Sequence, residues 1–273
     1  MSDELNTEMS LYQPGQPGAN QHRAARYLPE WFTATFDRDP PEELHIVGLG
    51  QSLESWYRYT MERNPAIDPG AEVWTVNRGL TAVAHDLLFV MDDLVGEAEL
   101  FPKYGDLLRS YERPFITSTP YAGFSGLAYP LVSVSCFWGG MNVAGYLHNS
   151  IPYLLALAGG IGVKRVVLWG CDYAKPDGTM LEYGLANVEY WCGLLRGRGV
   201  TVGRPQTSTI LGGQREQDWI YGYRLNRLPG SLREALSALE TPAAPPAEPK
   251  SGKEAEHAFL HPATTPAGPS ESP

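Results

Sequence analysis

The sequence predicts an α/β protein: a single domain with a Rossmann-like, doubly wound and mostly parallel sheet, followed by a disordered C-terminal tail. Short apolar runs recur along the chain, and runs of about four to six such residues are typical of strands buried on both faces of a parallel sheet. These runs are LHIVGLG, EVWTVN, DLLFVMDD, PFITSTP and KRVVLWGCD. Helical segments fit between them at 53–63, 153–160 and 186–198, and a short VTV strand follows the last helix.

Composition divides the chain into three parts. Residues 1–40 are rich in Pro, Gly, Asn and Gln and are expected to form an N-terminal arm, partly disordered. Residues 41–240 are expected to form the Rossmann-like nucleotide-binding domain. Residues 241–273 consist largely of Pro, Ala, Glu, Ser and Thr, which cannot bury enough apolar area to offset chain entropy, so this tail is expected to be disordered. Within the arm, one aromatic and aliphatic cluster is suited to packing on the domain: Tyr27, Leu28, Trp31 and Phe32.

Charge and cysteine content narrow the functional classes. With 31 acidic and 21 basic residues, the net charge of −10 provides no broad basic face, so nucleic acid is not an expected partner. Cys136, Cys171 and Cys192 are far apart and lack metal-ligand spacing. Neither a disulfide framework nor structural zinc is expected, and a reducing, cytoplasmic compartment fits best.

The first residues lack the basic start and apolar stretch of a signal peptide. Residues 126–163 carry no Asp, Glu, Lys or Arg, but Pro, Gly, Ser and Asn interrupt them. A bilayer span needs about 20 predominantly apolar residues. We therefore predict a buried strand and a buried helix here, and no membrane span. The sequence leaves the oligomeric state open.

Polar or small residues follow each apolar run, at the strand ends where ligands bind in doubly wound sheets. The same residue types also make ordinary turns. Their appearance after every predicted strand favours a ligand site. These residues are 48–52, Asn77, Asp92 and Asp93, 117–119, and Asp172.

The first of these loops follows a strand and opens a helix. Gly48 and Gly50 permit close approach, and the backbone amides through Gln51 and Ser52 are placed to face a phosphate. The loop lacks the third glycine of a dinucleotide motif, the second run ends in Asn77 in place of an acid, and no Gly-Lys-Ser/Thr follows. NAD-linked and Walker-type chemistry are therefore not expected, and neither is haem.

The order GLGQSL, WTVNRGL, FVMDDL and NSIPYLLALAGGIGVKRVVLWGCDY resembles the bacterial sialyltransferase family that uses CMP-sialic acid. It is similar also to the related motility-accessory and 6-hydroxymethylpterin diphosphokinase-like proteins. The resemblance covers about residues 44–202, and the stretch 149–173 is its most specific part. It implies a sialyltransferase-like fold with a nucleotide-sugar donor as co-substrate.

Carried over by position, the resemblance implies that loop 48–52 lies at the nucleotide phosphates. It implies that Asn77 lies near the nucleotide or donor sugar, with Asp92 at a polar donor contact. Asn149 and Ser150 would surround the nucleotide from the start of a long helix. Independently, Ser150 is suited to cap a helix whose free amides and dipole favour an anion.

The chain departs from the family at three places. Leu49 and Asp92 stand where the family has asparagines, and residues 174–221 contain no histidine to match the family's catalytic one. Two candidates for the general base remain. His148 is one, because an imidazole is suited to deprotonating an acceptor hydroxyl, although a single histidine before a helix also fits a structural role. The other candidate is an acid, Asp92 or Asp93.

Three further groups of polar residues are candidates for ligand binding. Asp92 and Asp93 are suited to hold Mg²⁺ on a diphosphate, although adjacent strand residues point to opposite faces, so one of them is expected to reach the site. Asp172 and Tyr173 end the last strong strand and are expected at the ligand. Tyr183, in the loop PDGTMLEYG, is suited to bind a leaving phosphate from a lid, or the loop is a plain Asp-Gly turn.

The sequence thus favours a nucleotide-sugar-dependent glycosyltransferase with an unidentified acceptor. One alternative is Mg-dependent pyrophosphoryl transfer from ATP, with Asp92 or Asp93 on the metal. The other is a catalytically inactive binding or assembly module of the same fold.

Overall fold

The computed structural model describes the chain over residues 16–62, 71–174, 181–212, 219–220 and 223–224. The expected tail, 241–273, lies outside the described residues, and so do residues 1–15 of the expected arm.

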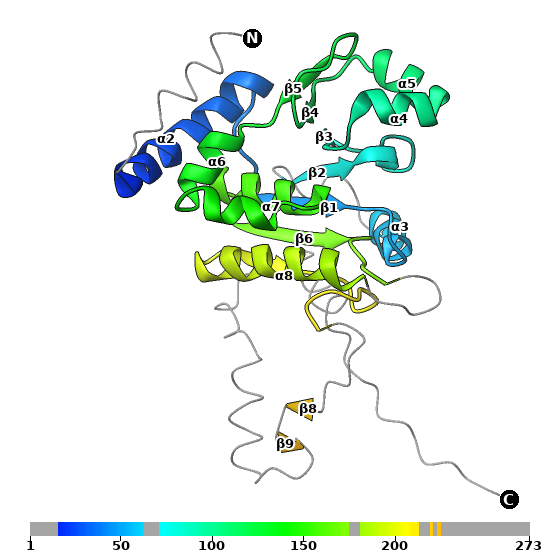
Figure 1. Cartoon of the computed structure of the whole chain (residues 1–273). Helices are drawn as coiled ribbons and strands as arrows, with labels where there is room; N and C mark the ends of the chain where they lie inside the picture. Colours follow the sequence, from blue (N-terminus) through cyan, green and yellow to red (C-terminus); the bar gives the residue numbers. More distant parts are fainter. Residues whose placement is uncertain (1–15, 63–70, 175–180, 213–218, 221–222, 225–273) are drawn as a thin grey trace, which may run out of the picture.

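A seven-stranded sheet forms the centre of the described chain, in the order β5-β4-β3-β2-β1-β6-β7, and every neighbouring pair in it is parallel (Figure 1). The α/β class with a Rossmann-like parallel sheet is therefore confirmed. All five apolar runs and the VTV segment are strands, whereas β5 was not predicted individually. The strands are β1 (Glu43–Val47), β2 (Ala71–Val76), β3 (Leu87–Val90), β4 (Phe115–Thr117), β5 (Gly126–Ala128), β6 (Arg165–Trp169) and β7 (Thr201–Gly203).

Helices cover both faces of the sheet, because the strands are apolar on both sides. On one face lie α2 (Pro17–Phe36), α6 (Leu131–Phe137), α7 (Ser150–Ile161) and α8 (Glu182–Gly197). On the other lie α3 (Leu53–Glu62), α4 (Leu94–Leu100) and α5 (Pro102–Arg109). The predicted helices correspond to α3, α7 and α8. Among the described helices, none is both long and apolar enough to cross a membrane.

Helix α2 brings part of the expected arm into the core. Ala24, Leu28 and Phe32 recur at a spacing of four and are fully buried, and the ring of Phe32 stacks on that of Trp74 in β2. The composition of residues 1–40 suggested partial disorder, but it averages over a helix whose apolar face decides the structure. Residues 17–36 thus belong to the folded domain.

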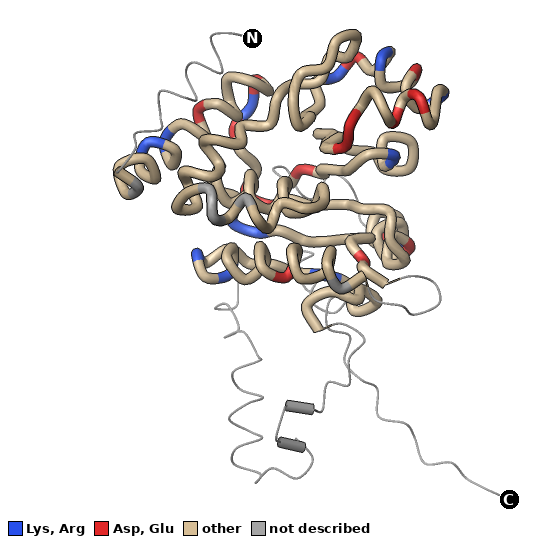
Figure 2. Tube along the Cα trace, in the orientation of Figure 1, with Lys and Arg blue, Asp and Glu red and all other residues tan. Residues whose placement is uncertain are grey.

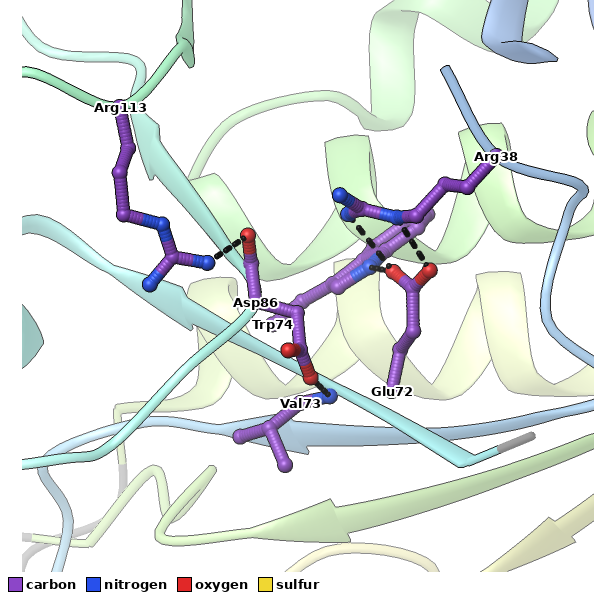
Figure 3. A network of polar contacts seen from close by, with 6 residues as sticks. All are labelled: Arg38, Glu72, Val73, Trp74, Asp86 and Arg113. Carbon is purple, nitrogen blue, oxygen red and sulfur yellow. Dashed lines mark hydrogen bonds and ion pairs between the residues drawn. The ribbon is translucent and has the colours of Figure 1, made fainter. Parts of the chain in front are cut away.

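One ion pair and several hydrogen bonds join the residues at the amino-terminal ends of β2, β3 and β4 (Figure 3). Arg38 makes a two-pronged contact with the carboxylate of Glu72, at 2.6 and 3.1 Å, and the indole of Trp74 donates to the same carboxylate. Arg113 donates to the carbonyl of Asp86 just before β3. These groups therefore satisfy one another at the amino-terminal edge of the sheet. Parallel sheets bind ligands at the other edge, beyond the carboxyl ends of their strands.

Candidate functional site

The loops after β1 and β6 meet at the point where the strand order reverses. The amide of Gly48 donates to the carbonyl of Trp169 at 2.8 Å, and that of Gly50 donates to Gly170 at 2.7 Å. In return, the Gly170 amide donates to the hydroxyl of Ser52 at 3.0 Å. The two loops are therefore hydrogen-bonded to each other along their length.

This contact explains the glycines of the first loop. A Cβ at Gly48 would lie 2.5 Å from the carbonyl oxygen of Gly170, and one at Gly50 would lie 2.7 Å from the carboxylate of Asp172. Gly170 itself has a φ of 58°, in the left-handed region that glycine adopts without strain. The glycines that suggested a phosphate loop are thus required by packing within the protein.

Asp172 occupies the start of α3. One carboxylate oxygen accepts from the Ser52 amide at 2.6 Å, and the other accepts from the Thr209 amide at 3.0 Å. The hydroxyl of Thr209 accepts from the amide of Tyr173 in turn. This carboxylate balances the positive end of α3. The amides of Gly48 and Gly50 bond carbonyls of the second loop and the Ser52 amide bonds Asp172, so all three have acceptors inside the protein. Gln51, by contrast, is exposed.

Helix α7 begins differently from the sequence prediction. The N-cap is Asn149, and Ser150 is the first helical residue, so Ser150 does not cap the helix. The Asn149 side chain makes no capping bond, because its Oδ1 accepts from the hydroxyl of Tyr173 at 2.7 Å. Burial raises the pKa of Tyr173, which keeps this donor protonated. The first-turn amides of α7 therefore lack a side-chain cap at the edge where β6 ends.

His148 and Tyr183 lie beside this helix start. Both side chains are exposed, Tyr183 by 66%, and their ring centroids are 5.1 Å apart. The carbonyl of Tyr183, in the first turn of α8, accepts from the side chain of Asn187. Residues 175–180 of the loop that precedes α8 lie outside the described residues. An imidazole, a phenol and uncapped amides thus share one part of the carboxyl edge.

The remaining described histidines have structural surroundings or lie elsewhere. His45 is buried in β1, where its Nδ1 accepts from the Trp169 indole and its Nε2 faces Glu43. His85 lies before β3 at the opposite edge, and burial lowers its pKa. His22 is exposed on α2. Among the described histidines, His148 alone is therefore placed for chemistry at the carboxyl edge.

Asn77 and Asp92 meet at the ends of β2 and β3. The Asn77 Nδ2 donates to the Asp92 carboxylate at 2.6 Å, from a left-handed backbone with a φ of 49°. Asp93 turns away and caps α4, accepting from the amide of Val95 at 3.1 Å. The acidic residues between β3 and α4 are red in Figure 2. The two adjacent carboxylates do not converge, and the described residues include no cluster of three or more His, Cys, Asp or Glu suited to a metal.

The structure thus brings the sequence-predicted residues together in two groups. Asn149, Tyr173, His148 and Tyr183 surround the start of α7, while Asn77 and Asp92 pair beyond β2 and β3. Both groups lie at the carboxyl edge of the parallel sheet, because Asn77 and Asp92 follow β2 and β3 and Tyr173 follows β6. Sequence reasoning missed Thr209, because nothing in its local sequence signals a bond to a strand end 37 residues earlier.

Comparisons with known proteins concern the fold. No family model matches the sequence, and no curated protein matches it. Solved structures do match. The sialyltransferase CstII from Campylobacter jejuni, with CMP-3FNeuAc, is 15% identical over 59% of this chain and 79% of that one, at a TM-score of 0.38. Its complex with cytidine-5'-monophosphate is 13% identical over 60% of this chain and 79% of that one, also at a TM-score of 0.38. An α-2,3-sialyltransferase from the same organism, in apo form, is 16% identical over 60% of this chain and 75% of that one, at a TM-score of 0.34.

Proposed function

We propose that this chain is a glycosyltransferase that transfers a sugar from a nucleotide donor to a hydroxyl acceptor by a single inverting displacement. The observation that carries the proposal is the position of His148. An exposed imidazole lies one residue from the N-cap of α7, whose first-turn amides have no side-chain cap, and in ring contact with Tyr183. This arrangement supplies a base and an anion-stabilising group side by side.

The proposed step uses these groups in sequence. The imidazole of His148 takes the proton of the acceptor hydroxyl as the acceptor oxygen attacks the anomeric carbon. The bond from that carbon to the donor phosphate breaks, and its electron pair leaves with the nucleotide. The negative charge that develops on the phosphate is stabilised by the amides of Ser150 and Ile151 at the start of α7 and by the hydroxyl of Tyr183.

The nucleotide phosphate is assigned to α7 in preference to α3. At α3 the carboxylate of Asp172 already accepts the Ser52 amide, and a second anion there would be repelled. At α7 the N-cap side chain is engaged by Tyr173 and makes no capping bond to the first-turn amides, which are those of Ser150 and Ile151 because Pro152 has none. Loop 48–52 then forms one wall of the site, and the exposed side chain of Gln51 faces the ligand from it.

A binding and turnover experiment tests the proposal. CMP, UDP, GDP and ADP, with their sugar esters, are screened by thermal shift, since a ligand at 100 times its Kd adds about 2.7 kcal/mol to stability. Bound donors are then incubated with the protein, and released nucleotide is measured. In parallel, ATP with Mg²⁺ is tested for AMP release. Nucleotide release from a sugar donor supports the proposal. AMP release would favour the pyrophosphoryl alternative, and the absence of all binding would contradict both.

A further inference from the structure

A second polar group adjoins the Asn77–Asp92 pair. Tyr104 of α5 is only 9% exposed, and its hydroxyl has no hydrogen-bond partner among the described residues. Its pKa is raised by burial first, and then by the charges of Glu97 and Asp92, so the hydroxyl lies within electrostatic range of both. We call Asn77, Asp92, Glu97 and Tyr104 the β3 cluster. It lies where α4 and α5 cover the end of β3.

The orientation of the Asn77 amide follows from its partner. A carboxylate only accepts hydrogen bonds, so the atom that faces Asp92 at 2.6 Å is the Asn77 nitrogen. The Asn77 oxygen then points the other way, where it is buried and has no partner in the described part of the chain. A buried oxygen without a donor is costly unless a ligand or water supplies one.

The positive charge nearest the cluster is already engaged. Arg78 lies 3.6 Å above the ring of Phe101 and 3.8 Å from the carboxylate of Glu97. The cluster therefore holds the exposed Asp92 carboxylate together with two buried groups that have no partner among the described residues, the Asn77 oxygen and the Tyr104 hydroxyl. The carboxylate and the Asn77 oxygen only accept hydrogen bonds, and the cluster as a whole carries negative charge.

We propose that the β3 cluster binds the glycosyl group of the donor through that group's hydroxyl or amino hydrogens, and rejects a glycosyl group that carries a carboxylate. The inference rests on the proposed function and adds the class of sugar. Hydroxyl and amino groups provide the donor that the Asn77 oxygen lacks and can add a second donor to the Asp92 carboxylate. A sugar acid would bring a second carboxylate against Asp92, while Arg78, the cation that acts on Tyr104 in the described part of the chain, already faces Glu97 and Phe101.

Matched nucleotide sugars test this selectivity. UDP-glucose and UDP-glucuronic acid share a nucleotide and differ only in a hydroxymethyl or a carboxylate at one carbon. GDP-mannose and GDP-mannuronic acid form an equivalent pair, and CMP-sialic acid is compared with CMP. Binding is measured by titration calorimetry on the full chain. For whichever nucleotide binds, we expect at least a tenfold preference for the neutral sugar, and no gain in affinity from CMP to CMP-sialic acid.

Two substitutions assign the preference to the cluster. Asp92→Asn removes the charge while keeping the size, so the ratio of the two Kd values is expected to fall to about threefold or less. Glu99→Gln makes the same charge change at an exposed site of α4 and is expected to keep the wild-type ratio. Melting temperatures of both variants establish that they fold.

The outcomes separate the two proposals. Equal affinity of the wild-type protein for both members of a pair, or a preference for the sugar acid, overturns the selectivity. A ratio that Asp92→Asn leaves unchanged overturns its assignment to the β3 cluster. In either case nucleotide binding and the proposed function stand. Failure of the wild-type protein to bind any nucleotide or nucleotide sugar overturns the proposed function itself, and the selectivity with it.

Discussion

The hydroxyl of Tyr173 donates to Oδ1 of Asn149 at 2.7 Å, which joins the end of β6 to the residue at the N-cap position of α7. A Cβ at Gly184 would collide with the same tyrosine ring, so the start of α8 packs against it as well. One partly buried phenol thus holds three elements in position around the start of α7.

Tyr173→Phe removes this bond and keeps the ring. We expect a loss of about 1 kcal/mol in the free energy of unfolding, because the Asn149 oxygen loses its donor, and a severalfold weaker affinity for the nucleotide. Urea denaturation and calorimetry measure the two effects. Tyr57→Phe is the matched control, since the Tyr57 hydroxyl bonds a carbonyl at an exposed site of α3. Equal behaviour of the two variants would show that the Tyr173 bond does not position α7.

Asp172→Asn tests the link between the strand-end loops. An asparagine side chain has a single acceptor oxygen, so either the Ser52 or the Thr209 amide would face an NH₂ group. We expect a loss of about 1–3 kcal/mol and faster hydrogen exchange at one or both amides. Exchange is followed by NMR at the two positions. Exchange rates that match the wild type would argue against this bridge.

Gly170→Ala tests the contact of the two loops. The new Cβ would overlap the carbonyl of Gly48, and the φ of 58° disfavours any side chain, so we expect a loss of about 2 kcal/mol or more. Gly193→Ala on α8 is the control, because nothing lies within 4 Å of its Cβ. There a helical alanine is expected to stabilise by about 0.5–1 kcal/mol. Similar melting temperatures for the two variants would contradict the explanation.

His148→Ala tests the general base. Single-turnover rates are expected to fall about a hundredfold or more while nucleotide affinity stays nearly constant, because the proton is transferred only in the chemical step. His22→Ala, at an exposed site of α2, is expected to turn over normally. If His148→Ala also turns over normally, the base is Asp92. A lower melting temperature with intact turnover would make His148 a structural residue.

Alkaline conditions are expected to destabilise the protein through Cys192. Burial raises the pKa of this thiol from 9.0 to about 12, so the native state keeps a proton that the unfolded state releases. This contribution is present in full below pH 9 and is lost as the pH rises towards 12, at up to about 1.4 kcal/mol per pH unit. Urea denaturation from pH 8 to 11 measures it. Cys192→Ala should show a shallower decline, and an unchanged slope would exclude this thiol as a cause.

Several features of the site followed from the sequence because they depend on local pattern. Short apolar runs predict buried parallel strands wherever they occur, and polar residues at strand ends must gather at one edge of such a sheet. Asn77 and Asp92 could therefore be expected near each other before their bond was seen. His148 and Asn149 could likewise be assigned to the start of a helix, since the apolar segment after them predicts one.

Only the tertiary structure decided what those residues bind within the protein. The Ser52 amide and the Asp172 carboxylate are 120 positions apart, and no local pattern reports which groups two loops exchange when strand order brings them together. The same holds for α2, whose apolar face has meaning only against Trp74 and its neighbours. Propensity and periodicity act over a few residues, whereas hydrogen-bond partners are set by the packing of distant segments. The sequence therefore determined which residues lie at the carboxyl edge of the sheet. Packing determined which of their polar groups already have partners within the protein.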